Sequence, residues 1–255
     1  MNELLKMTAH QVKEGKFDKA ILAIGSCEAH GQHLAEGCDT IVSYELSKQV
    51  ADRVPGMLVL PPITVGYSGH YDTFPFTLTF DYETMIHVIY DIVESVLRNG
   101  INKIFLMNGH DGNIAPIEIA ARKIKEKYPD ARIASLPEWW VIAGKLVPEG
   151  TFAVWNGLGH AGEGESSIAY HLFPQWCEPD QATCVVPDHL PEHVDIKWDF
   201  AEITDTAQTG DATVATAAKG KLMNDCLVEA VVKDIEALEK TGWNYNTSHY
   251  QCRQS

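Results

Sequence analysis

The sequence contains no long hydrophobic run and no strongly basic segment. No window approaches the roughly 20 apolar residues that a membrane-spanning helix needs, and the opening MNELLKMTAHQVKEGKF lacks the apolar core of a signal peptide. We therefore expect a cytoplasmic protein with no membrane partner. A formal net charge of -15 repels phosphate backbones, so we also expect no nucleic-acid partner.

Paired cysteines, linkers and repeats are also missing. The six cysteines form no CxxC pair, which predicts reduced thiols rather than a disulfide framework. No linker, charge block or internal repeat divides the chain, so we predict a single domain over residues 1–255. With 45% hydrophobic and 22% charged residues, the composition is that of a folded globular protein.

What the sequence does contain is a regular alternation of two patterns. Short apolar runs predict strands at 20–26, 57–65, 103–108 and 132–137, and longer helical stripes predict helices at 42–54, 82–98, 116–128 and 213–240. Such alternation is typical of β-α-β units built around a mostly parallel sheet, so we predict the α/β class.

Three polar clusters follow apolar segments: Glu28 and His30 with Asp39, then Asn108, His110 and Asp111, then His160, Glu163 and Glu165. Because parallel sheets bind ligands beyond the carboxyl ends of their strands, we expect all three at one rim. Histidines and carboxylates together suit a pair of divalent cations, one carboxylate bridging both. Two such ions would lower the pKa of a bound water and hold a substrate carbonyl.

Other interpretations remain open at this point. Cys27 beside Glu28 could be the nucleophile of a thiol amidase. The run GLGHAG at 157–162 matches the dinucleotide pattern GxGxxG, although it lies too late for a first βαβ unit. A protein that binds metal without turnover is a further alternative. His189 and His193 are four apart, but Pro191 between them predicts a polar loop rather than a metal-binding helix.

The polar clusters carry a resemblance to the creatininase, or creatinine amidohydrolase, family. GSCEAHGQHLAEGCD resembles the family pattern GSxEQHGPHLPxxTD, NGHDGN resembles NGHGGN, and HAGEGESS resembles HAGExETS. Between them, FPFTLTF resembles FPGTxSL. The matches keep the family's order and extend from about residue 21 to 171.

This resemblance implies a metal-dependent hydrolase with a three-layer α/β/α sandwich fold. Two divalent ions, zinc in the first place and manganese or iron as alternatives, are then implied as cofactors. The implied metal ligands are Glu28, His30, Asp39, His110 and Glu163. His160 and Glu163 are the implied catalytic residues, with Asp39 as the bridge, and Glu165 is an alternative fifth ligand. Some members are hexamers, so a homo-oligomer is expected.

The sequence also departs from creatininase proper. Gly112 stands where creatininase draws a metal-binding Glu from GHYEN, and His70-Tyr71 stands where many members have a Glu-His pair. The family's reactions imply a small-molecule substrate, and we expect attack on the C–N bond of a cyclic amide. Ring opening of a diketo-inositol, deformylation of a formamide and peptide cleavage are alternatives. The expected substrate-binding residues are Ser68, His70, Asp111, Trp139 and Trp140, the tryptophans as an apolar lid or else as core packing.

Overall fold

The central sheet of the protein has four parallel strands. The computed structural model describes residues 2–188, 193–194 and 196–244. The strands are β1 (Lys19–Ile24), β2 (Met57–Val59), β3 (Lys103–Asn108) and β4 (Arg132–Leu136), in the spatial order β2-β1-β3-β4. Strand β2 is shorter than the apolar run predicted, because Pro61 and Pro62 have no backbone N–H to donate to a ladder.

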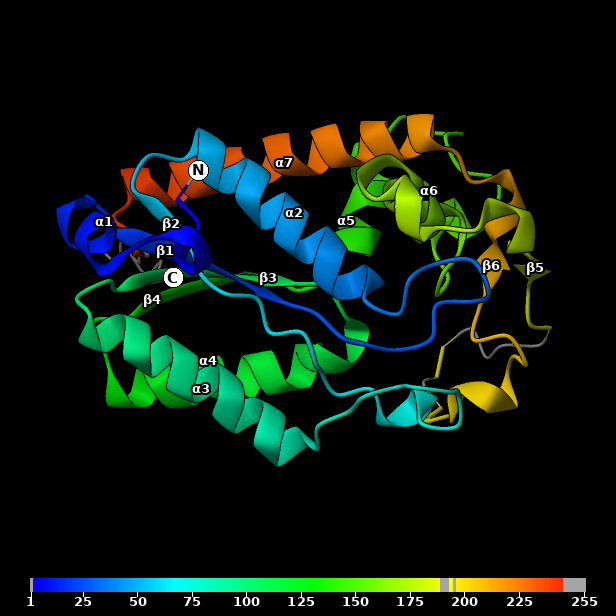
Figure 1. The fold of residues 1–255 in the computed structure, drawn as a ribbon, viewed down its shortest axis with the longest axis horizontal. Coiled ribbons are helices and arrows are strands. Elements are labelled where there is room, and N and C mark those ends of the chain that lie inside the picture. Colours follow the sequence, from blue (N-terminus) through cyan, green and yellow to red (C-terminus); the bar gives the residue numbers. More distant parts are fainter. Residues whose placement is uncertain (1, 189–192, 195, 245–255) are drawn as a thin grey trace, which may run out of the picture.

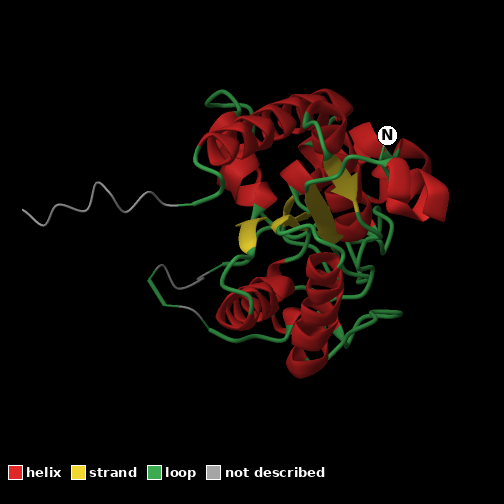
Figure 2. Cartoon of the chain, turned by 90° about the vertical axis from the view of Figure 1, so that its left-hand side faces the viewer, coloured by secondary structure: helices red, strands yellow, loops and turns green. Residues whose placement is uncertain are grey.

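Helices cover both faces of this sheet (Figures 1 and 2). One face carries α2 (Cys38–Arg53), α5 (Trp139–Leu146) and α7 (Ala217–Lys240), and the other carries α3 (Tyr82–Arg98) and α4 (Ile114–Lys127). Helix α6 (Glu163–Leu172) packs against α7, and the short α1 (Ala9–Glu14) precedes β1. The predicted three-layer α/β/α sandwich is confirmed.

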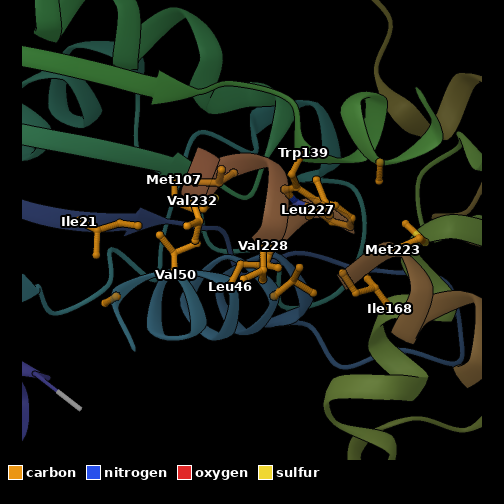
Figure 3. Packing of buried hydrophobic residues seen from close by; sticks show 14 of the residues in the cluster. Ile21, Leu46, Val50, Met107, Trp139, Ile168, Met223, Leu227, Val228 and Val232 are labelled. Carbon is orange, nitrogen blue, oxygen red and sulfur yellow. The ribbon is translucent and has the colours of Figure 1, made fainter. Parts of the chain in front are cut away.

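Two hydrophobic clusters, one on each face of the sheet, form the core. Side chains of β1 alternate between them, so Ile21 contacts the α2 and α7 side while Leu22 contacts the α3 and α4 side. Both faces of β1 are fully buried, which explains its unbroken apolar sequence. Figure 3 shows α2 and α7 packing together over the sheet, and Trp139 lies beside Leu227 in this cluster.

The segments between α6 and α7 are mostly irregular. They contain the antiparallel pair β5 (Cys184–Val185) and β6 (Gly210–Asp211) and the short 3-10 helix η7 (Phe200–Glu202). The polar loop predicted around His189 and Pro191 lies largely outside the described residues. Within the described part of the chain, no helix is both long and apolar enough to traverse a lipid bilayer.

Candidate metal centre

The polar clusters of the sequence meet at the carboxyl edge of the sheet. Ile24 at the end of β1 pairs with Asn108 at the end of β3, so the loops that follow both strands leave the sheet side by side. These loops carry Glu28, His30 and His110, and the N-terminal turn of α2 adds Asp39. A carboxylate at that helix end is favoured by the helix dipole.

Asp39 lies between two histidines and offers a different oxygen to each. Its Oδ1 is 2.9 Å from His30 Nε2, and its Oδ2 is 3.1 Å from His110 Nδ1. The Ser26 hydroxyl donates a 2.7 Å hydrogen bond to Oδ2 and fixes the carboxylate. A carboxylate held in this way can bridge two cations.

Each histidine of the cluster is anchored to a backbone carbonyl through one ring nitrogen. His30 Nδ1 is 3.1 Å from the carbonyl of Glu28, His110 Nε2 is 2.7 Å from that of Tyr67, and His160 Nε2 is 2.7 Å from that of Ala29. These partners only accept, so each anchoring nitrogen carries the proton when the ring is neutral. The lone pair of the other nitrogen then faces the carboxylates.

Glu28 completes this arrangement. Its carboxylate is fully buried, and neither oxygen has a hydrogen-bond partner within the described residues. Its Oε1 lies 3.1 Å from His110 Nδ1 and 3.9 Å from His160 Nδ1, and both are ion-pair distances. The contact with His110 lacks the geometry of a hydrogen bond. Lone pairs aimed at a buried carboxylate repel it unless a cation lies between them, so the donor set fits metal ions.

Possible ligand atoms gather in three overlapping groups within the described residues. Glu28, Asp39 and His110 offer atoms within 4.8 Å of one another, and so do Glu28, His30 and His160. A third group contains His30 and Asp39 with Cys38, whose thiol has a pKa raised by burial and then by the nearby carboxylates. Divalent metal binding is therefore supported at the edge where the sequence predicted it.

The charged groups of the cluster shift one another's pKa values. Burial by itself would lower the pKa of His30, but Asp39, Glu165 and Glu28 raise it to about 10. His110 likewise has a pKa well above its usual range, because Glu28 and Asp39 outweigh burial. Without metal, these two imidazoles are protonated at neutral pH and compensate the carboxylates.

The third polar cluster supplies Glu165 rather than Glu163 to this site. Glu165 lines the same cavity as Asp39, His110 and His160. Its pKa is raised to about 7, by burial first and also by Asp39 and Glu28, while His30 opposes the rise. Its Oε2 accepts a 2.6 Å hydrogen bond from the backbone N–H of Ala161.

Glu163 lies on the other side of α6 and does not reach the cluster. Its carboxylate is fully buried, forms an ion pair with Lys219 of α7, and accepts a 2.7 Å hydrogen bond from the backbone N–H of Ala153. Two residues along an α-helix are separated by about 200° around its axis, so Glu163 and Glu165 cannot face the same ions. The resemblance had assigned Glu163 to both metal binding and catalysis.

The NGHDGN motif contributes His110 to the cluster, and its two asparagines hold the surrounding backbone by hydrogen bonds. The Asn108 side chain bridges His110 and Pro137, and that of Asn113 bridges Tyr67 and Gly25. Gly112 leaves no room for a side chain, since a Cβ there would lie 2.1 Å from the carbonyl oxygen of Tyr67 that anchors His110. The backbone itself therefore excludes a ligand at this position.

A cavity of about 300 Å³ opens over the cluster. Asp111 and Trp140 line it, as the substrate-binding prediction requires, and it also contains Tyr71, Phe200 and Thr209, which the sequence analysis missed. Phe200 carries no recognisable sequence signal, and Tyr71 could have been found only as the departure beside His70.

The remaining predicted pocket residues lie behind the cavity wall. Trp139 is fully buried in the core, which is the packing alternative considered for it. Ser68 is also fully buried, with its hydroxyl 3.4 Å from His110 Nε2. The His70 ring stacks on that of His110 at a centroid distance of 5.9 Å, so Ser68 and His70 both lie beside His110 and neither lines the cavity.

Cys27 is poorly placed to act as a nucleophile. It does not line the cavity, and burial, then the charges of Glu36 and Glu28, raises the pKa of its thiol. A reactive cysteine needs the opposite shift, toward the thiolate. The thiol-amidase alternative therefore lacks support in the structure.

Known proteins are similar to this chain in sequence and in fold. Residues 5–235 match the family model described as Creatininase: Creatinine amidohydrolase. The chain is 28% identical over 230 residues to the creatinine amidohydrolase of Pseudomonas putida, covering 84% of this chain and 87% of that protein. It is 25% identical over 242 residues to the mycofactocin precursor peptide peptidase of Mycobacterium ulcerans (strain Agy99), covering 89% and 90%. A solved structure named creatininase Mn superimposes with a TM-score of 0.77 at 26% identity, covering 92% of this chain and 98% of that one.

Proposed function

Since the chain belongs to the creatininase family and is therefore a metal-dependent hydrolase, we propose that it cleaves an amide C–N bond of a small, cyclic substrate. The observation that carries this proposal is the buried Glu28 carboxylate, whose Oε1 lies 3.1 Å from Nδ1 of His110 and 3.9 Å from Nδ1 of His160, two histidines anchored to backbone carbonyls through their other ring nitrogen. The cavity of about 300 Å³ above it matches the small end of pockets that bind small molecules.

We assign two divalent ions to this centre and five residues to holding them. Glu28 and His110 would hold one ion, His30 and Glu165 the other, and Asp39 both, since its two oxygens face different histidines. The mixed nitrogen and oxygen set favours zinc and also accepts manganese or iron. Glu163 is instead assigned a supporting role, because its ion pair with Lys219 and its bond to Ala153 tie α6 to α7 and to the preceding loop.

When bound, the ions supply a water of lowered pKa and polarise the substrate carbonyl. Proton transfer is assigned to a residue of the chain. His160 points Nδ1 toward Glu28, while the carbonyl of Ala29 holds the protonated Nε2 of the neutral ring. A neutral His160 can accept a proton at Nδ1 from the attacking water and deliver it to the departing nitrogen.

The experiment that tests this function measures bound metal and hydrolysis on the same samples. Purified protein is analysed for metal content and then assayed on cyclic amides, formamides and cyclic diketones, before and after chelation. We expect turnover of a cyclic amide that is lost with the metal and returns with it. Cleavage of a cyclic diketone or a formamide alone would instead support the carbon–carbon hydrolase or the deformylase.

Variants connect that activity to the centre. Glu28→Gln, Asp39→Asn and His110→Ala should each abolish turnover and leave the fold intact by circular dichroism. Asp72→Asn is the matched control, because this exposed carboxylate lies in the neighbouring loop and does not line the cavity. Turnover at wild-type rates in the first three variants would rule out the proposed centre, and bound metal without any turnover would favour a metal-binding protein.

A further inference from the structure

Asp111 presents a carboxylate to the cavity without a partner. It is exposed and lines the cavity beside the ligand His110. No ion pair or hydrogen bond satisfies its side chain within the described part of the chain, and no lysine or arginine described there lines the cavity. The corresponding place in the family pattern NGHGGN is a glycine, so this carboxylate adds to the metal-binding motif.

Aromatic rings form a wall of the cavity that Asp111 also lines. The ring centroids of Tyr71 and Phe200 are 4.5 Å apart, and each also contacts His160, at 4.5 and 5.1 Å. Trp140 lines the same cavity. Burial, then the charges of the cluster and of Asp111, raises the pKa of the Tyr71 phenol well above its usual range, so this ring stays uncharged.

A carboxylate that shares a cavity with aromatic rings, and has no lysine or arginine beside it there, is suited to a particular chemistry. Aromatic faces attract cations, and a carboxylate accepts charge-assisted hydrogen bonds from N–H groups. An anionic substrate group at this place would be repelled by Asp111, because no lysine or arginine among the described residues lines the cavity and the charge of His110 is compensated by Glu28 and Asp39. The wall is therefore complementary to a flat group that carries positive charge.

We propose that Asp111, together with the aromatic wall of Tyr71, Trp140 and Phe200, recognises a cationic nitrogen group on the substrate, such as an amidinium, guanidinium or ammonium. The inference rests on the proposed function, since it assigns this cavity to the substrate. Asp111 is then a specificity-determining residue that positions the carbonyl over the metal centre. Substrates lacking the cation should bind more weakly.

Binding of two matched probes to the metal-loaded protein tests this proposal. Benzamidinium and benzamide have the same flat ring and nearly the same shape, but only the first is charged. Their dissociation constants are measured by isothermal titration calorimetry on wild type, Asp111→Asn and the control Asp72→Asn. Asp111→Asn retains the shape of the side chain and removes its charge, and Asp111→Gly restores the residue of the family pattern.

We expect wild type to prefer benzamidinium, and Asp111→Asn to lose about tenfold in affinity for it while benzamide binding is unchanged. Asp72→Asn should behave as wild type. Methylguanidinium and methylammonium, as further probes, show which cation fits best. An equal affinity for both probes in wild type, or the same benzamidinium affinity in Asp111→Asn, overturns the proposal.

The binding assay is independent of turnover. If no amide were hydrolysed and Asp111 still governed benzamidinium binding, the proposed function would fail and the cation site would stand. If hydrolysis were observed and the probes bound without discrimination, only the cation site would fail.

Discussion

The two glutamates of α6 should respond oppositely to the same substitution. Glu165 is buried among carboxylates, and its pKa is raised from 4.5 to about 7. A carboxyl group whose pKa is raised in the folded state destabilises the fold when the pH is above that pKa, because ionisation is easier in the unfolded chain. The effect is small when the pH is below the pKa of the unfolded chain. The penalty is about 3 kcal/mol at pH 8 and about 1 kcal/mol at pH 5.

Glu165→Gln removes this penalty from the metal-free protein. At about 2–4 °C per kcal/mol for a chain of this size, its Tm should rise by about 6–12 °C at pH 8, and by much less at pH 5. The same change removes a proposed metal ligand, so metal affinity should fall. Glu163→Gln should do the reverse, because it leaves the ammonium of Lys219 without its ionic partner.

The expected cost of Glu163→Gln is about 2 kcal/mol, or about 4–8 °C in Tm, with metal affinity close to that of wild type. Differential scanning calorimetry of metal-free samples and competition with a chromophoric chelator measure the two quantities. Wild-type metal affinity in Glu165→Gln, combined with a large loss in Glu163→Gln, would refute the assignment of Glu165.

Three further predictions follow from the same geometry. Metal binding should release protons, because His30 has a pKa of about 10 without metal. The metal affinity should therefore rise about tenfold per pH unit for each released proton, up to that pH. Calorimetry in buffers of different ionisation enthalpy measures the release, and a pH-independent affinity would contradict it. Metal at a hundred times its Kd stabilises the folded protein by about 2.7 kcal/mol, so chelation should lower the Tm by about 5–10 °C. An unchanged Tm in calorimetry would speak against a bound ion. Cys27→Ala should retain hydrolysis in the amide assay, since its thiol lies outside the cavity, and an inactive, folded variant would revive the thiol mechanism.

The layered fold was predictable because its signals are local. The apolar run of β1 is buried on both faces, and the four-residue stripe of α2 packs on the sheet, as their periods predict. The end of β2 and the starts of α2, α4 and α7 differ from the predicted bounds by two to six residues, and the short helices α1, α5 and α6 were not predicted. The rim also follows from topology, since parallel strands bring their carboxyl ends to one edge.

The proposed fifth ligand was harder to predict because its position depends on the helix that begins at Glu163. If that helix start is known, Glu163 and Glu165 must face different sides, and only one of them can reach the rim. The choice between them then depends on the distant Lys219, whose approach through α6 and α7 packing no local pattern encodes.

The cavity wall depends still more on long-range packing. Tyr71 and Phe200 contact each other although they are far apart in the chain, and each lies in a short 3-10 helix within a long connecting segment. Trp139 and Trp140 are adjacent, yet the turn of α5 buries the first in the core and directs the second to the cavity. Sequence period alone cannot assign such residues to the substrate.

The most direct test of the metal centre is an anomalous-diffraction map from crystals of the zinc- or manganese-loaded protein. We predict two peaks at the carboxyl edge of β1 and β3, both within coordination distance of Asp39, one beside Glu28 and His110 and the other beside His30 and Glu165. A map without peaks at this edge, or with metal bound only elsewhere on the protein, would contradict the account.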